Sequence, residues 1–257
     1  MTPLLLHIYA LVVGLCVGSF LNVCIYRLPA GKSVVRPASA CPACGRLIRW
    51  YENIPLLSYI ILRGRCRGCN TTIALRYPIV ELLTGLAALA VVTYFGIQLQ
   101  SLIYFLFVAS LILVTFIDID HRIIPDVISL PGIPIGFAAS FILPQVNWTD
   151  SLIGVLLGGG SLLVIAWGYQ LITGREGMGG GDIKLLAMIG AFLGWKGVLF
   201  TIMSSSFIGT LVGVTLMLKT RKGMRLSIPF GPFLSIGSII YLFFGERIIH
   251  WYFYELL

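Results

Sequence analysis

Two aspartates stand where apolar stretches of the chain end. Asp118 closes residues 82–117, which carry no charged side chain, and Asp182 follows the glycine-rich run 177–181. A carboxylate next to hydrocarbon is costly, so such residues are usually functional. Two carboxylates that approach each other closely cannot both ionise and therefore share one proton. In that state one takes a proton from water and the other polarises a carbonyl group, which is the chemistry of aspartic proteolysis.

The acidic residues also have simpler interpretations. Asp126 and Asp182 are typical of helix N-termini, where aspartate caps the first turn. Asp120 and Arg122 are consistent with an ion pair at the membrane surface. Proton-relay or ion-transport aspartates would have a similar composition. Residue types and spacing therefore leave proteolysis and transport both open, and they do not decide between Asp118 and Asp120.

Four of the six cysteines form two CxxC pairs with 21 residues between them. The four are Cys41, Cys44, Cys66 and Cys69. This spacing is close to that of a four-cysteine zinc site, in which thiolates fill a tetrahedral shell and the metal is structural. Gly45 and Gly68 suit the tight turns of such a site. Cys16 and Cys24 lie in an apolar stretch and are interpreted as small buried residues.

The elements that must position these residues are strongly apolar. Of the 257 residues 58% are hydrophobic and 11% are charged, whereas soluble domains average about 45–50% and about 25%. This composition excludes a water-soluble globule and a disordered chain. We predict an all-α polytopic membrane protein with about eight transmembrane helices and a small cytoplasmic four-cysteine zinc-binding insertion. The predicted helices cover residues 4–24, 78–96, 101–118, 126–144, 150–173, 183–194, 197–218 and 229–249.

These helices divide the chain into three predicted parts. Residues 1–26 hold the first transmembrane helix, residues 27–77 a polar insertion, and residues 78–257 the membrane-embedded core with both aspartates. The insertion is too short to build a large core and needs a metal or a disulfide. A cytoplasmic location disfavours disulfides, which favours zinc. The segment 183–194 is short enough for a partial or tilted span.

The basic residues sort to one side of the predicted membrane. Sixteen of the eighteen Lys and Arg residues fall in residues 25–77, near Arg122, at Arg175 and Lys184, and in residues 219–225. By the positive-inside rule this side is cytoplasmic, so the insertion and both aspartates face the cytoplasm. The net charge of +8 then reflects topology and contact with membrane lipid. We expect no nucleic-acid partner.

The order of the motifs resembles that of the type IV prepilin peptidases, the bifunctional leader peptidases and N-methyltransferases of pilus and type II secretion systems. The resemblance spans nearly the whole chain, and the cysteine-bearing insertion matches the longer form of that family. The matching segments are Gly18-Ser-Phe-Leu-Asn-Val, the four cysteines, Glu52-Asn-Ile-Pro-Leu-Leu-Ser-Tyr, Arg76-Tyr-Pro-Ile-Val-Glu81, Asp118-Ile-Asp120-His121, Ile124-Pro125-Asp126, Gly174-Arg-Glu-Gly-Met-Gly-Gly-Gly-Asp182-Ile-Lys-Leu-Leu-Ala and Pro229-Phe-Gly-Pro232.

The resemblance implies that Asp118 and Asp182 are catalytic, the latter ending a Gly-x-Gly-Asp signature. It implies hydrolysis of one peptide bond, typically after a glycine, in the basic leader of a prepilin or pseudopilin. The new N-terminal residue is then methylated with S-adenosylmethionine. Gly64 and Arg65 correspond to a Gly-basic pair associated with methyl transfer. The implied location is the bacterial inner membrane, with the active site facing the cytoplasm.

Two other classes of function compete with this interpretation. One is a secondary transporter whose cytoplasmic domain is stapled by zinc, and the other is a non-catalytic zinc-ribbon adaptor that assembles a membrane complex. An inverted repeat would favour transport, and the motif order contains none. The residues specify neither the prepilin or pseudopilin that is cut nor an oligomeric state. The adaptor interpretation requires that both aspartates are dispensable, which separates it from the enzyme.

Overall fold

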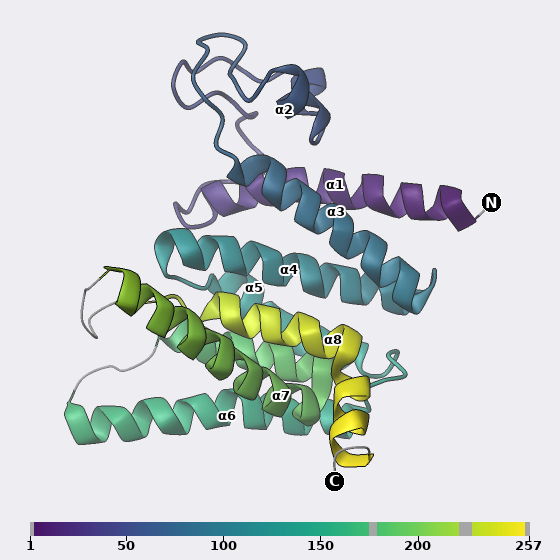
Figure 1. The fold of residues 1–257 in the computed structure, drawn as a ribbon, viewed down its shortest axis with the longest axis vertical. Helices are drawn as coiled ribbons and strands as arrows, with labels where there is room; N and C mark the ends of the chain where they lie inside the picture. Colours follow the sequence, from purple (N-terminus) through teal and green to yellow (C-terminus); the bar gives the residue numbers. More distant parts are fainter. Residues whose placement is uncertain (1–2, 175–178, 221–227, 255–257) are drawn as a thin grey trace. The chain divides into compact units, whose positions relative to one another are not determined.

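The computed structural model describes residues 3–174, 179–220 and 228–254 (Figure 1). Within these ranges the long regular elements are helices, and the paired β-residues are two isolated bridges, Ala40 with Leu47 and Arg65 with Thr72. The predicted all-α class is confirmed. Part of the glycine-rich motif, 175–178, and the basic residues of 221–225 lie outside the described residues. The chain divides into two compact units, Met1–Leu113 and Val114–Leu257.

The first unit pairs two long apolar helices and carries the polar insertion between them. Its elements are α1 (Pro3–Arg27), the short 3-10 helix η1 (Trp50–Asn53), α2 (Leu57–Ile61), α3 (Arg76–Phe95) and the first part of α4 (Leu99–His121). The antiparallel α1 and α3 meet at glycines: a β-carbon on Gly14 would lie 2.6 Å from Ala88 Cβ, and one on Gly18 would lie 2.7 Å from Glu81 Cα. Small residues allow such close packing between membrane helices.

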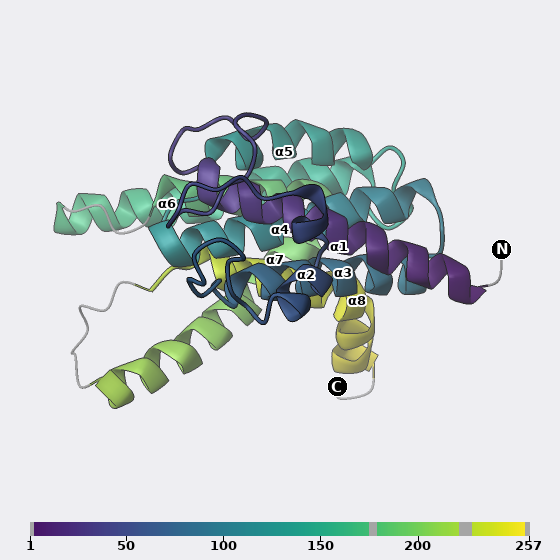
Figure 2. The same ribbon diagram turned by 90° about the horizontal axis from the view of Figure 1, so that it is seen from above.

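The second unit contains the end of α4 and four further helices. They are α5 (Asp126–Ala139), α6 (Trp148–Thr173), α7 (Gly180–Thr220) and α8 (Gly231–Tyr254). Helix α7 packs on the other three, and Leu185 and Leu186 near its start are fully buried. Its backbone leaves helical geometry at Gly194 (φ 71°, ψ −179°), a conformation that favours glycine. The segments on either side of Gly194 run in different directions (Figures 1 and 2). Because Leu185 and Leu186 are buried, the start of α7 is fixed in the core of this unit.

The helix boundaries confirm one predicted break and correct one predicted end. Helix α7 consists of two helical segments joined at Gly194, where the backbone is not helical, so the predicted separation of 183–194 from 197–218 is confirmed. The segment predicted at 126–144 ends at Ala139, and the N–H groups of Ile142 and Leu143 then bond the Ala139 carbonyl oxygen in turns.

Membrane-crossing length can be assessed for the described residues. Five of their helices are long and apolar enough to cross a membrane, namely α1 from Leu4 onward, α3, α4, α6 and α7 to Lys219. Helix α5 and the Gly231–Gly245 part of α8 are apolar but shorter. The class of membrane protein is thereby confirmed. The count of eight transmembrane helices and the domain division at residues 26 and 77 stay predictions.

Candidate active site and metal centre

Asp118 is buried near the end of α4 and is held by a backbone amide from the start of α8. Only 5% of Asp118 is exposed to solvent. The Gly231 N–H donates a hydrogen bond of 2.9 Å to Asp118 Oδ2. A β-carbon on Gly231 would lie 2.7 Å from the same oxygen, so only glycine lets the backbone come this close. The geometry gives Asp118 one fixed donor and a defined orientation.

Asp182 reaches the same place from the first turn of α7. It is the third residue of that helix, and its N–H bonds the Gly179 carbonyl oxygen at 3.2 Å. Ile124 links the two aspartate segments, because a β-carbon on Gly181 would lie 2.9 Å from Ile124 Cβ and one on Gly231 would lie 3.3 Å from Ile124 Cδ1. The Asp118 and Asp182 carboxyl groups are close enough for their charges to interact. The structure thus brings together the two aspartates selected from the sequence.

The other two acids of these segments have different surroundings. Asp120 is exposed, two residues beyond the buried Asp118 on the same helix. Asp126 is also exposed, and Lys184 Nζ lies 2.7 Å and 2.8 Å from its two carboxylate oxygens. The suggested capping role of Asp126 is wrong, because the N-cap of α5 is Pro125 and Asp126 is the first helical residue. Asp126 instead ties the start of α5 to the first turn of α7.

The two CxxC pairs form matching knuckles in the insertion. In the first, the Gly45 N–H bonds the Cys41 carbonyl oxygen at 2.8 Å, and in the second the Asn70 N–H bonds the Cys66 carbonyl oxygen at 2.9 Å. Both turn residues have positive φ, 69° at Gly45 and 57° at Asn70. Gly68 lies within the second turn, as predicted, but the residue with positive φ there is Asn70. Asparagine takes that place because it tolerates the left-handed region better than most residues do.

The four cysteine sulfur atoms form one cluster. All four lie within 4.8 Å of one another, and Cys41 Sγ and Cys69 Sγ are 3.8 Å apart. Tetrahedral zinc with Zn–S bonds of about 2.3 Å requires sulfur atoms about 3.8 Å apart. Hydrogen bonds with Thr71 lower the pKa of Cys69, whereas the neighbouring cysteines raise that of Cys44, so the fit to a metal rests on the arrangement of the sulfur atoms. The donor set therefore fits a zinc ion with a closed shell.

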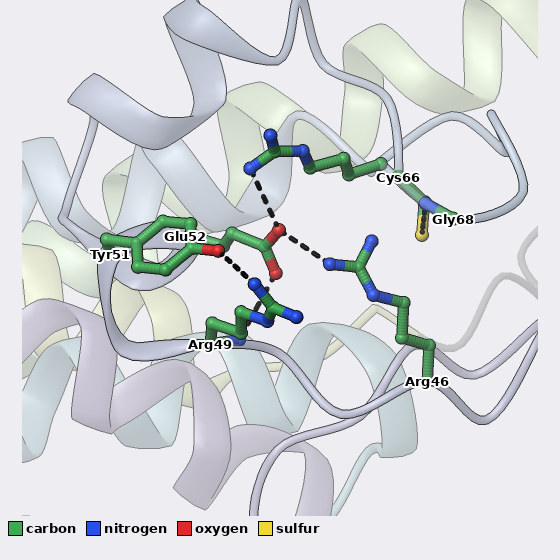
Figure 3. A network of polar contacts seen from close by, with 7 residues as sticks. Arg46, Arg49, Tyr51, Glu52, Cys66 and Gly68 are labelled. Atoms are coloured by element: carbon green, nitrogen blue, oxygen red, sulfur yellow. Dashed lines mark hydrogen bonds and ion pairs between the residues drawn. The ribbon is translucent and has the colours of Figure 1, made fainter.

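A carboxylate joins the two knuckles (Figure 3). Glu52 Oε1 lies 2.8 Å from Arg46 Nη2 of the first knuckle and 3.5 Å from Arg67 Nη1 of the second. The Arg49 backbone N–H donates to Glu52 Oε2 at 3.2 Å, and this bond, with the two arginines, lowers the pKa of Glu52. The side chain is 7% exposed. Glu52 thus links the two knuckles through contacts with one arginine of each.

The predicted methyl-transfer pair lies between α2 and the second knuckle. Gly64 is buried with φ 67°, and a β-carbon there would lie 2.8 Å from the Tyr59 hydroxyl oxygen. Arg65 is exposed, and its backbone pairs with Thr72. Gly64 therefore fixes the backbone that presents Arg65, while the role of the pair in methyl transfer stays a prediction.

Sequence reasoning gave no role to Gly231. Its contact with Asp118 joins residues 113 positions apart, and no local pattern reveals such a pairing. The available signal was the Pro229-Phe-Gly-Pro232 motif, in which a glycine stands between two prolines.

Comparison with known proteins identifies the family. The Bacterial Peptidase A24 N-terminal domain matches residues 12–95, and the Type IV leader peptidase family matches residues 104–214. A prepilin leader peptidase/N-methyltransferase of Pseudomonas putida is 38% identical over 96% of this chain and 94% of its own. Proteins with the same name from Pseudomonas aeruginosa and Aeromonas hydrophila are 39% and 38% identical over 97% and 93% of this chain, and over 94% and 91% of their own. No solved structure matches. The four cysteines lie in the first matched region and both aspartates in the second, and the chain belongs to the type IV leader peptidase family.

Proposed function

We propose that this protein cleaves the short basic leader from type IV prepilins or type II secretion pseudopilins and N-methylates the new N-terminal residue. The observation behind the proposal is that Asp118, bonded to the Gly231 amide, is close enough to Asp182 for their charges to interact, in a chain 38% identical over 96% of its length to a protein named for both activities. The adaptor interpretation gives no reason for a pair of interacting acids, and the family match names a leader peptidase and not a transporter. We therefore favour the enzyme.

The two aspartates have different proposed roles. An N–H donor favours the charged form of a carboxyl group, so Asp118, bonded to the Gly231 amide, is the ionised partner. Asp182 carries the shared proton. Asp118 takes a proton from water as the water oxygen attacks the scissile carbonyl carbon, and Asp182 donates its proton to the carbonyl oxygen. When the intermediate collapses, the C–N bond breaks, the leaving amine takes the proton from Asp118, and Asp182 regains its own.

The glycine run before Asp182 supports access of a peptide to this pair. Gly179 and Gly180 are exposed, and a β-carbon on Gly180 would meet no atom within 4 Å. A segment without side chains lets a substrate backbone approach closely. In the proposed orientation the cut occurs at the cytoplasmic face of the bacterial inner membrane, where the leader is accessible.

The insertion is the proposed location of two bound groups, a structural zinc ion and the methyl donor of the second activity. Zinc held by the four cysteines is structural, because a closed tetrahedral shell has no open position for catalysis. S-adenosylmethionine, when bound, supplies a methyl group on a positively charged sulfur. The exposed Arg65 guanidinium fits the carboxylate of that molecule, and Gly64 fixes the backbone from which it projects.

The test is incubation of the purified protein in detergent with a prepilin or pseudopilin, followed by mass measurement of the product. Loss of the leader and gain of one methyl group are expected with S-adenosylmethionine, and leader loss alone without it. The matched control is Asp120→Asn, an exposed acid on the same helix as Asp118, which should retain cleavage. An unchanged substrate mass with the folded protein would contradict the proposal.

A further inference from the structure

The short helix α2 exposes its apolar residues and turns its polar ones inward. Leu57, Ile60 and Ile61 are 57%, 69% and 76% exposed. The hydroxyl groups of Ser58 and Tyr59 instead donate hydrogen bonds to carbonyl oxygens of the insertion, at Ile54 and Ile73. The exposed positions, i, i+3 and i+4, form one face of the helix. In water this arrangement would be unfavourable, so the face requires an apolar environment.

A hydrogen bond to α3 sets the depth of this face relative to the membrane. The Leu56 N–H, immediately before α2, donates to Glu81 Oε2 at 2.9 Å. Glu81 lies five residues into the membrane-length helix α3, which corresponds to about 7.5 Å along its axis. Leu56 has φ 59° and ψ −48°, a positive-φ conformation rare for leucine that the bond to Glu81 helps to hold. Helix α2 therefore begins level with the second turn of a helix that crosses the bilayer.

The charge around α2 matches an anionic surface. Residues 27–77 contain nine Lys and Arg residues and one acid, Glu52, which already contacts two arginines. Arg63 and Arg65 follow α2 directly and are exposed, and the exposed fraction of Trp50 in η1 is 82%. Apolar side chains flanked by arginine and tryptophan are typical of segments that lie in the membrane interface.

We propose that the Leu57/Ile60/Ile61 face of α2 lies in the boundary between headgroups and acyl chains of an anionic phospholipid bilayer. The arginines that follow it contact the lipid phosphates. The depth set by Glu81 and the excess of positive charge favour lipid over a protein partner as the occupant of this face. Interfacial helices place their apolar side about 5–10 Å into this boundary, which agrees with the position of Leu56 along α3. The zinc-binding insertion is thereby held flat on the membrane.

The test uses the full-length protein in vesicles of phosphatidylcholine with and without phosphatidylglycerol. A fluorescent amino acid is incorporated by codon suppression at Ile60 or, as a matched control, at Ala43, an exposed position at the tip of the first zinc knuckle. Acyl chains brominated near the headgroup should quench the reporter at 60 and leave that at 43 unaffected, whereas iodide in the buffer should do the reverse. Quenching at 60 should be stronger with phosphatidylglycerol, and about 1 M salt should remove that difference by screening.

Three outcomes would overturn the proposal. Iodide quenching at 60 equal to that at 43 would mean that the α2 face is in water. Protection of position 60 from both quenchers would mean that protein, from this chain or a second copy, covers the face. Equal lipid quenching with and without phosphatidylglycerol would mean that anionic lipid does not bind this face, which contradicts the proposal. Wild-type zinc content in each reporter variant shows that the insertion is folded, and none of these measurements depends on the proposed enzymatic activity.

Discussion

Replacement of Gly231 by alanine tests the geometry of the aspartate pair directly. The β-carbon of alanine would lie 2.7 Å from Asp118 Oδ2 and 3.3 Å from Asp118 Cγ. Non-bonded heavy atoms are comfortable at about 3.5 Å, so the carboxylate must move by about 0.8 Å. The atom in conflict is the free end of a side chain, which can rotate at low cost to stability. The variant should fold while its carboxylate is displaced.

The expected loss of activity follows from that displacement. A misplacement of about 1 Å can reduce an enzymatic rate about 100-fold, so a shift of about 0.8 Å predicts a 10- to 100-fold lower kcat for leader cleavage. This range corresponds to about 1.4–2.7 kcal/mol of transition-state stabilisation. The shift also lengthens the bond from the Gly231 amide, which removes the donor that favours the charged form of Asp118.

The assay is single-turnover cleavage of a prepilin in detergent, with thermal stability measured in parallel. Gly168→Ala is the control, because this α6 glycine has open space around its β-carbon position. It should cleave at the wild-type rate. Methylation of a precut substrate should be unchanged in both variants. Wild-type cleavage by folded Gly231→Ala protein would refute the argument that this amide positions Asp118.

Asp118→Asn and Asp182→Asn should each abolish leader cleavage and leave methylation of a precut substrate intact, because an amide cannot cycle between acid and base; mass measurement of both products checks this. Cys41→Ser and Cys66→Ser should lower bound zinc, measured by metal analysis, and expose residues 27–77 to protease, since zinc binding contributes to folding. The pKa of Glu52 is below its ordinary value of 4.5, so its stabilising effect is complete above that value and is lost as the pH falls through the lowered pKa. Limited proteolysis at graded pH should show this acid loosening in the wild type, and Glu52→Gln should remove it.

The candidate site was only partly predictable from the sequence. The end of a long charge-free stretch located Asp118, but Asp120 stands two residues away with the same chemistry. Two residues advance a helix by about 200°, which places their side chains on opposite faces. Asp118 is buried as a result, and Asp120 is exposed. Which face of α4 is covered depends on packing between distant segments, and the sequence contains no local signal for it.

The fold shows the same division between local and long-range information. CxxC spacing predicted the four-sulfur cluster because knuckle geometry is local, although in the second knuckle the residue with positive φ is Asn70 and not a glycine. Apolar stretches predicted where helices occur. They located the break within α7 at Gly194, but they extended α5 to residue 144, beyond its end at Ala139.

A buried carboxylate in each unit accepts a backbone amide from a distant segment. Glu81 accepts the Leu56 N–H in the first unit, and Asp118 accepts the Gly231 N–H in the second. An amide donor stabilises a carboxylate without introducing a cation into an apolar region. The difference lies in the next neighbour. Asp118 interacts with the charge of Asp182 and can share a proton, whereas Ser19 is the side chain that hydrogen-bonds Glu81. The first arrangement therefore suits acid–base chemistry, and the second suits a fixed anchor for the insertion.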